Sequence, residues 1–288
     1  MKILETRYPK GTFKGQKTDG RYIDENLNSN IKLLAKHIKR DMTYLGIISS
    51  STLEVGTGKS VFIQQFAEAF LEGVREYHGI DNRLSMKNIV FSPKDLIDRA
   101  FKLPKYSVIL LDEWEDSHYW SQLGMSLRQF FRKCRQLNLL ILCVIPNLFQ
   151  LGMNYSVSRS LFFIDILFQN EFERGFFKFY NFQSKRKLFL MGKKQQNYGC
   201  VKPDFIGRFL DGYVVDEAEY RRAKRLDMEK YDEETKPITE KQIKIKLFNQ
   251  LNLNLVKVTI KELSKAFGIG ESTAYRWLQE GEKKETKT

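Results

Sequence analysis

Residues 53–60 read Leu-Glu-Val-Gly-Thr-Gly-Lys-Ser, and they constrain the fold more than any other stretch of the chain. They follow a short apolar run at 44–50 that predicts a strand, and they precede a helical pattern at 61–77. Glycines between a strand and a helix let successive backbone N–H groups curl around an anion, and the positive end of the helix adds to the attraction. The stretch therefore predicts a phosphate-binding loop in an α/β fold.

The loop fits the pattern G-x-x-x-x-G-K-[ST] except at its first position, where Leu53 stands in place of glycine. We expect Lys59 to bridge the β- and γ-phosphates of ATP and the Ser60 hydroxyl to ligate Mg²⁺. A chance Gly-Thr-Gly-Lys-Ser in a surface loop is the alternative, and Leu53 bears on the affinity and shape of the loop. The expected nucleotide-binding residues are Glu54, Val55, Gly56, Thr57, Gly58, Lys59, Ser60 and Val61.

A second apolar run, at 107–111, ends in the acid pair Asp112 and Glu113. Ligands of open α/β sheets bind at the carboxyl ends of the strands, so these carboxylates should face the nucleotide. We expect Asp112 to hold Mg²⁺ through water and Glu113 to act as the general base on the attacking water. A solvated turn is the alternative when this motif is taken alone.

Asn147 follows the next apolar run, at 139–145, and its amide is a candidate sensor of the γ-phosphate or the attacking water. The alternative is a Pro-Asn pair that only forms a turn. A guanidinium best meets the charge of the phosphoryl transition state, often from a neighbouring subunit. The candidate catalytic residues are Glu113, Asn147, Arg132, Arg135 and Arg159.

Arg128, Arg132 and Arg135 fall at i, i+4 and i+7 of a predicted helix and so share one face. Three interpretations of this face stay open: a subunit contact, a DNA contact or a solvated surface.

Strand and helix patterns alternate over roughly 140 residues, which predicts an α/β fold with a mostly parallel sheet flanked by helices. We expect an N-terminal arm at 1–30, a nucleotide-binding domain at 31–192 and a charged connecting segment at 193–237. Residues 238–288 return to helical periodicity and predict a small all-α domain.

Residues 259–278 within that small domain have the pattern of a helix-turn-helix, with Gly268 at the sharp turn. The second helix would start at Glu271 or Ser272 and present its outer side to the major groove of DNA. The expected DNA-binding residues are Ser272, Thr273, Tyr275 and Arg276. A helical protein-interaction module with the same packing is the alternative.

The chain carries 48 Lys and Arg against 35 Asp and Glu, a net charge of +13. This surplus attracts polyanions and favours nucleic acid as a partner, although solubility alone also explains basicity. We find no run near the ~18 apolar residues that span a bilayer and no signal-peptide pattern at the N-terminus. The three cysteines have neither disulfide nor zinc spacing, so the expected location is a reducing host-cell cytoplasm.

The Gly-Thr-Gly-Lys-Ser loop, the Ile-Leu-Leu-Asp-Glu strand, the basic helix and the Ile-Pro-Asn stretch resemble the RecA-type P-loop ATPases of the FtsK/HerA superfamily. The resemblance covers about residues 40–190 and is nearest to the zonula-occludens-toxin-like ATPases of viruses and plasmids. It implies a RecA-like sheet, ATP and Mg²⁺ as cofactors, and a homo-oligomer, often a hexamer, that moves double-stranded DNA. Phage toxin-like members carry a transmembrane segment, and this sequence shows none.

Two hypotheses for the function therefore stay open. The first is an ATP-driven motor that translocates or packages DNA for a virus or mobile element. The second is a non-motor ATP switch of the AAA+ kind, acting in replication initiation, helicase loading or transposition. A sequence-specific repressor with a decayed ATP site is a third hypothesis, which Leu53 keeps open.

Overall fold

The computed structural model describes residues 22–51, 56–112, 122–169, 173–235, the single positions 260, 264 and 267, and residues 270–275. The chain divides after Arg225 into two compact units, Met1–Arg225 and Leu226–Thr288. Among the described residues, no helix is both long enough and apolar enough to cross a membrane.

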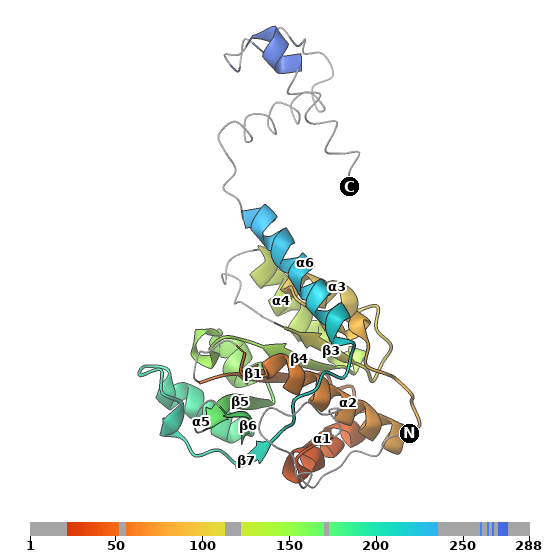
Figure 1. Cartoon of the computed structure of the whole chain (residues 1–288), viewed down its shortest axis with the longest axis vertical. Coiled ribbons are helices and arrows are strands. Elements are labelled where there is room, and N and C mark those ends of the chain that lie inside the picture. Colours follow the sequence, from red (N-terminus) through yellow and green to blue (C-terminus); the bar gives the residue numbers. More distant parts are fainter. Residues whose placement is uncertain are drawn as a thin grey trace. The chain divides into compact units, whose positions relative to one another are not determined.

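The first unit is built on a seven-stranded sheet in the order β2-β3-β4-β1-β5-β6-β7 (Figure 1). The first five strands of this order are parallel, whereas β6 and β7 are antiparallel to their neighbours. The predicted α/β class with a mostly parallel sheet is confirmed. The strands are β1 Tyr44–Ser49, β2 Ile89–Val90, β3 Val108–Leu111, β4 Leu140–Val144, β5 Phe162–Gln169, β6 Glu173–Tyr180 and β7 Phe205–Arg208.

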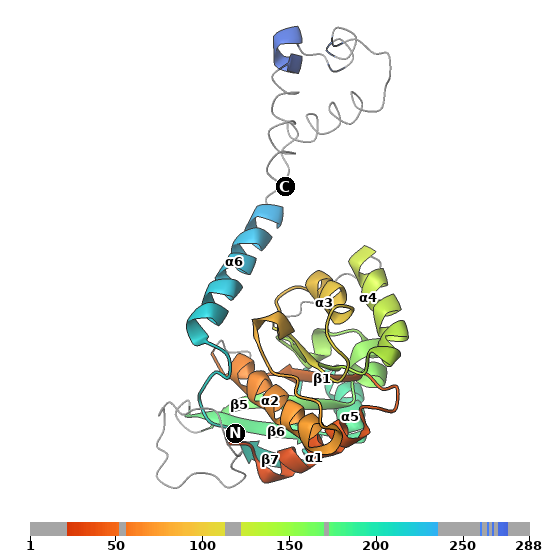
Figure 2. The same ribbon diagram turned by 90° about the vertical axis from the view of Figure 1, so that its right-hand side faces the viewer.

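Helices cover both faces of this sheet, because the strands are apolar on both sides (Figure 2). Successive residues of β1 alternate between two cores: Tyr44 and Ile48 belong to one buried cluster, and Leu45 and Ile47 to the other. The helices α1 and α2 pack on the first cluster, and α3, α4 and α5 pack on the second. Their bounds are α1 Glu25–His37, α2 Lys59–His78, α3 Pro93–Ala100, α4 Gln122–Lys133 and α5 Phe182–Gly192.

Local sequence signals set several helix ends. Asp24 caps α1 by accepting hydrogen bonds from two backbone N–H groups of the first turn. Ser92 caps α3 in the same way, with Pro93 in its first turn, as the sequence predicts. Gly73 lets α2 approach α1, because a Cβ at this position would lie 2.9 Å from the Cβ of Ala35.

A strap of residues 209–216 crosses α2 and leads into α6, Glu217–Thr235. Two buried glutamines of α2 hold it: Gln65 Nε2 donates to the carbonyls of Leu210 and Gly212 at 2.7 and 3.0 Å. Gln64 Oε1 accepts from the backbone N–H groups of the next residues of the strap, 214 and 215. The first turns of α6 are thereby fixed to the sheet unit next to the start of α2.

The second unit is described in its last part only at positions 260, 264, 267 and 270–275. Residues 271–275 form a helical turn in which Ala274 is buried and Tyr275 is exposed. The backbone N–H groups of Thr273 and Ala274 both donate to the carbonyl of Gly270. The helix-turn-helix remains a prediction, and Arg276 lies outside the described residues.

Candidate nucleotide-binding and catalytic site

The glycine loop leads directly into α2 at the carboxyl edge of β1. Gly56 and Gly58 have φ values of +86° and +93°, a region that side chains with a Cβ rarely adopt. Gly58 is also the N-cap of α2, which begins at Lys59. A Cβ at Gly58 would lie 3.1 Å from the ring of Phe209, so any other residue would also crowd the strap. Of the expected loop, residues 53–55 lie outside the described part.

The two motifs meet at Ser60 and Asp112. The Ser60 hydroxyl donates to the carboxylate of Asp112, with Oγ 3.1 Å from Oδ1 and 3.0 Å from Oδ2. The strands β1 and β3 are parallel, and β4 is the one strand between them. The loop after β1 and the acid after β3 therefore lie close together at the same edge of the sheet. Asp112 is 1% exposed. Glu113 follows it directly and lies outside the described residues.

The donors at this point suit Mg²⁺. A hydroxyl and a carboxylate are hard oxygen ligands, and Mg²⁺ typically takes one or two protein carboxylates while keeping water and phosphate oxygens. The part of the chain that the structure describes contains no cluster of three or more His, Cys, Asp or Glu side chains. Ser60 and Asp112 would hold such an ion together with phosphate oxygens of a nucleotide and water.

Two side chains of α6 also reach Asp112. The Tyr220 hydroxyl donates to Asp112 Oδ2, and Lys224 Nζ lies 3.3 Å from the same oxygen. Burial, and then the neighbouring Asp112 charge, raise the pKa of Tyr220 far above its usual value, so it stays a hydrogen-bond donor. The sequence carried a weak signal for this contact, namely a tyrosine and a lysine at i and i+4 in the charged segment after 216.

Asp165 on β5 is a second buried carboxylate at the same edge, and sequence reasoning missed it. Its Oδ1 accepts a hydrogen bond of 2.7 Å from the backbone N–H of Ser51, at the start of the phosphate loop. Burial raises the pKa of Asp165 to about 6, against the opposing effects of hydrogen bonding to Ser51 and then of the charges of Lys178 and Lys59. Oδ2 has no hydrogen-bond partner among the described residues. The only signal was one acid in an otherwise apolar strand.

Arg174 of β6 lies beside the loop as well. A Cβ built on Gly56 would be 3.4 Å from Arg174 Nη2, so the guanidinium rests next to the loop backbone. This arginine approaches on the β5–β6 side of β1, whereas Asp112 approaches on the β3–β4 side. No sequence motif marks it, because it sits in a hairpin far along the chain.

Asn147 lies at the carboxyl end of β4, but its amide is engaged in the local fold. Its Oδ1 accepts from the backbone N–H of Phe149 at 2.9 Å and from the Tyr198 hydroxyl at 3.0 Å. Its Nδ2 donates to Gln196 Oε1 at 3.0 Å. This geometry favours the turn-forming interpretation, and the sensor role remains a prediction.

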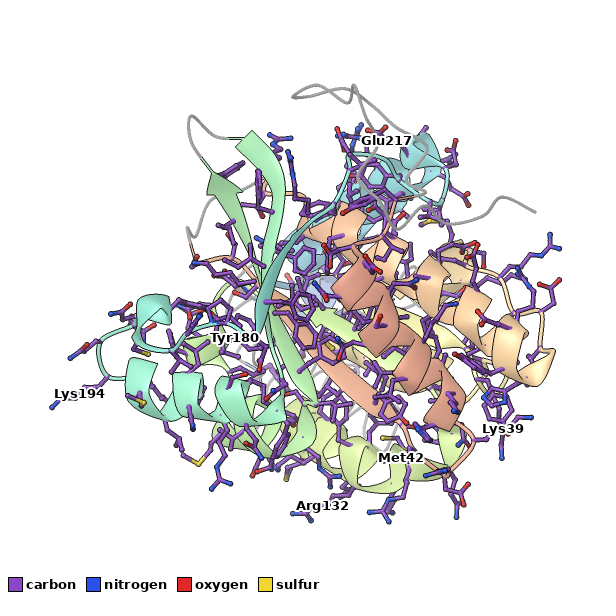
Figure 3. The ribbon with its side chains drawn as sticks, turned by 90° about the horizontal axis from the view of Figure 1, so that it is seen from below. Lys39, Met42, Arg132, Tyr180, Lys194 and Glu217 are labelled. Carbon is purple, nitrogen blue, oxygen red and sulfur yellow. The ribbon has the colours of Figure 1, made fainter. Side chains whose placement is uncertain are left out.

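The candidate arginines are placed at the opposite edge of the sheet. The Thr43 hydroxyl, just before β1, donates to the carbonyls of Cys134 and Arg135, and Arg159 lies three residues before the start of β5. Figure 3 shows Arg132 on the side of the unit away from Glu217, the first residue of α6. The six residues of β1 separate this edge from the loop by about 16 Å. Any contact of these arginines with a triphosphate would need a second copy of the chain.

No protein-family model matches the chain, and no curated protein matches it. A search of solved structures finds the crystal structure of the DnaC helicase loader, at 21% sequence identity and a TM-score of 0.28. That match covers 50% of this chain and 76% of the other. The assignment of the site accordingly rests on the geometry of this chain.

Proposed function

We propose that this chain is a Mg²⁺-dependent P-loop ATPase that uses ATP hydrolysis to move or package DNA for a virus or mobile element. The observation that carries the ATPase proposal is the meeting of the glycine loop and the acidic strand end at Ser60 and Asp112. A hydroxyl and a carboxylate at 3.0 Å, next to Lys59 and a helix N-terminus, form the arrangement that a Mg²⁺-bound triphosphate requires.

Each residue of the site has a separate task in this proposal. The loop N–H groups and Lys59 bind the phosphates, and Ser60 and Asp112 hold the ion, which neutralises charge on the β- and γ-phosphates when bound. Glu113 would take a proton from the attacking water, whose oxygen bonds to the γ-phosphorus while the bond from that phosphorus to the oxygen of ADP breaks, giving ADP and inorganic phosphate. Arg174 stands where it can bind the phosphate chain from the other side of the loop.

DNA is proposed as the partner on the charge of +13 and on the C-terminal pattern. Ser272 and Tyr275 are exposed on the described helical turn while Ala274 is buried, which agrees with one outward and one inward face. Ser272, Thr273, Tyr275 and Arg276 are the proposed readers of the major groove. A homo-oligomer, and a hexamer in particular, belongs to the same proposal.

A specific contact also supports the second candidate, a non-motor ATP switch. Tyr220 and Lys224 bind the metal-facing carboxylate Asp112, and they lie on the helix that continues into the second unit at Leu226. An ion at Asp112 would compete with Lys224. Nucleotide occupancy would then change how α6 is held, which is what a switch needs.

ATP turnover measured with and without duplex DNA, together with the mass in solution, separates these functions. A motor hydrolyses many ATP molecules per DNA bound and displaces a protein roadblock from the duplex. A switch hydrolyses slowly and binds at one site. A chain that shows no heat on titration with Mg–ATP would be neither, and the ATPase proposal would fail.

Deletion of residues 236–288 tests the tail. We expect weaker DNA binding with basal ATP hydrolysis retained, because the nucleotide site lies within the first unit. DNA affinity that stays unchanged after the deletion would remove the tail as the DNA reader.

A further inference from the structure

The amino edge of the parallel sheet carries an exposed basic residue two to five positions before the start of each of its five parallel strands. Reading across the sheet in the order β2, β3, β4, β1, β5, these residues are Lys87, Lys105, Arg135, Arg40 and Arg159. We call this set the basic row. All five side chains are exposed, and none of them takes part in an ion pair found among the described residues.

Hydrogen bonds link the segments that carry the row. The Asn138 side chain donates to the carbonyl of Ile38 at 2.6 Å, and the backbone N–H of Tyr106 donates to the carbonyl of Asn138 at 2.9 Å. The segments before β1, β3 and β4 are therefore fixed against one another. Figure 3 shows Lys39, Met42 and Arg132 along this side of the unit, opposite Glu217.

Carboxylates are scarce on this edge. The segments that lead into the five strands, 38–43, 79–88, 101–107, 134–139 and 152–161, contain two acids, Asp41 and Asp81. Asp81 is already bound by Arg75 and Arg83, with N–O distances of 2.6 and 3.2 Å. A row of exposed cations with little acid beside it creates a positive potential that attracts a polyanion.

The spacing of the row fits a nucleic-acid backbone. Neighbouring strands lie about 4.8 Å apart, so the five strands that follow the row are about 19 Å across. One strand of duplex DNA carries a phosphate for every ~3.4 Å of helix axis, so this length faces about five or six phosphates. We infer that the basic row is a second nucleic-acid surface, which binds the phosphate backbone of a duplex without reading its sequence.

This inference goes beyond the proposed function, in which DNA is bound by the C-terminal tail. It places a DNA contact on the ATPase unit itself, at the edge of the sheet away from the nucleotide site. It depends on neither ATP hydrolysis nor the helix-turn-helix, and each of these can fail without affecting it.

The test is duplex binding by the full chain carrying Arg40→Glu and Arg135→Glu, over a series of salt concentrations. The matched control carries Lys94→Glu and Lys194→Glu, which change the net charge equally at two exposed positions outside the row. We expect at least about tenfold weaker binding at low salt for the row variant, and a slope of log affinity against log salt smaller by about two. The control should keep the wild-type slope.

A second pair, Lys87→Glu with Arg159→Glu, guards against a folding defect in the first, and Mg–ATP binding reports on the fold of both. Duplex affinity and salt slope that match the control in both pairs would overturn the inference. The inference would also be overturned if the row variants bound duplex DNA normally but lost ATP hydrolysis. The arginines would then be acting on the triphosphate of a neighbouring copy. Failure of Mg–ATP binding by the wild-type chain would sink the proposed function and leave this inference standing.

Discussion

The two edges of the parallel sheet are built from the same strands, yet their charged side chains differ: the carboxyl edge combines buried carboxylates with cations, among them Arg174 and Lys224, whereas the amino edge carries mainly exposed cations. At the carboxyl edge stand the buried carboxylates Asp112 and Asp165, and the sequence continues from the first of them as Asp-Glu-Trp-Glu-Asp. At the amino edge stands the basic row, which begins with Lys87 before β2 and ends with Arg159 before β5. In our proposals, the first edge holds Mg²⁺ on a phosphate chain and the second binds the phosphates of nucleic acid directly.

Part of this difference follows from the direction of the helices. Helices that connect parallel strands start at the carboxyl edge and end at the amino edge, so their positive ends lie on the side of the glycine loop and their negative ends on the side of the row. The last turns of α1 and α4 carry basic residues that suit a negative helix end, among them Lys36 and Arg132. Three members of the row also lie in the last turn of a short helix, Lys87 in 86–88, Arg135 in 134–137 and Arg159 in 154–159. Arg40 and Lys105 lie outside any helix, so helix dipoles do not account for the whole row.

The largest expected effect is the loss of ATP hydrolysis in Glu113→Gln, a change at the carboxyl edge that should leave the amino edge unaffected. Loss of the general base removes about 10²- to 10⁴-fold of the hydrolysis rate, while ATP still binds. Single-turnover hydrolysis and filter binding of labelled ATP measure the two quantities. DNA binding through the amino edge should stay unchanged. Full ATPase activity in this variant would remove the assignment of Glu113 as the base.

Lys59→Ala should remove nucleotide binding rather than hydrolysis alone. The lysine makes charge-assisted hydrogen bonds to phosphate that are worth about 1.5–3 kcal/mol each, so two of them account for roughly 100-fold or more in affinity. Calorimetric titration with Mg–ATP gives the loss, and Lys94→Ala, an exposed lysine at the start of α3, is the control. Equal heats in the two variants would contradict the phosphate-binding loop.

A prediction of intermediate size concerns Asp165, at the carboxyl edge, and the pH dependence of folding stability. The pKa of its carboxyl is raised from 3.8 to about 6, so the folded state holds this proton more tightly than the unfolded state. The resulting stability is fully present below about pH 4 and is lost as the pH rises to about 6. Asp165→Asn should therefore be more stable than the parent above pH 6, by on the order of 1–3 kcal/mol, with no difference near pH 4.

Denaturant unfolding at several pH values measures this difference in free energy. Asp98→Asn, at an exposed position of α3, is the control variant. A gap between Asp165→Asn and the parent that is the same at every pH would show that the buried carboxyl titrates normally.

Asp165 also shows where sequence reasoning stops. The loop at 56–60 and the acid at Asp112 were predictable, because each is a local pattern fixed by strand, turn and helix. Strand alternation likewise predicted the parallel sheet. Asp165 and Arg174 reach the loop only through the pairing of β5 with β1 and of β6 with β5, and strand order is not written in any local pattern.

Tyr220 and Lys224 are a further case. They lie 108 and 112 residues beyond Asp112, and the strap that brings them to it is held by hydrogen bonds from Gln64 and Gln65. Two glutamines on a helix carry no sequence signal for such a role. The segment after Gly192 therefore looked like a charged connection, although β7 and the start of α6 belong to the sheet unit.

The smallest predicted effect concerns the contact between Lys224 and Asp112, and it tests how cations act at the carboxyl edge. Lys224 is the one cation of α6 whose ion pair reaches into the acidic edge among the described residues, with Nζ 3.3 Å from Asp112 Oδ2. The side chain of Lys224 is 24% exposed and that of Asp112 is 1% exposed, so the pair lies at the upper end of the range for solvent-screened pairs, about 0.5–1 kcal/mol. Lys224→Ala should free the carboxylate for an ion and lower the Mg²⁺ concentration that half-saturates ADP binding by about two- to fivefold.

Arg221→Ala is the matched control for this prediction, because Arg221 is a neighbouring cation of α6 that pairs with Glu217 and not with Asp112. Fluorescent ADP titrated with Mg²⁺ gives the half-saturating concentration for each variant. A higher Mg²⁺ requirement in Lys224→Ala would mean that the lysine assists the bound nucleotide directly. In that case a cation of α6 would bind phosphate at the carboxyl edge, as the row is proposed to do at the amino edge. The two edges would then not differ in how they bind phosphate.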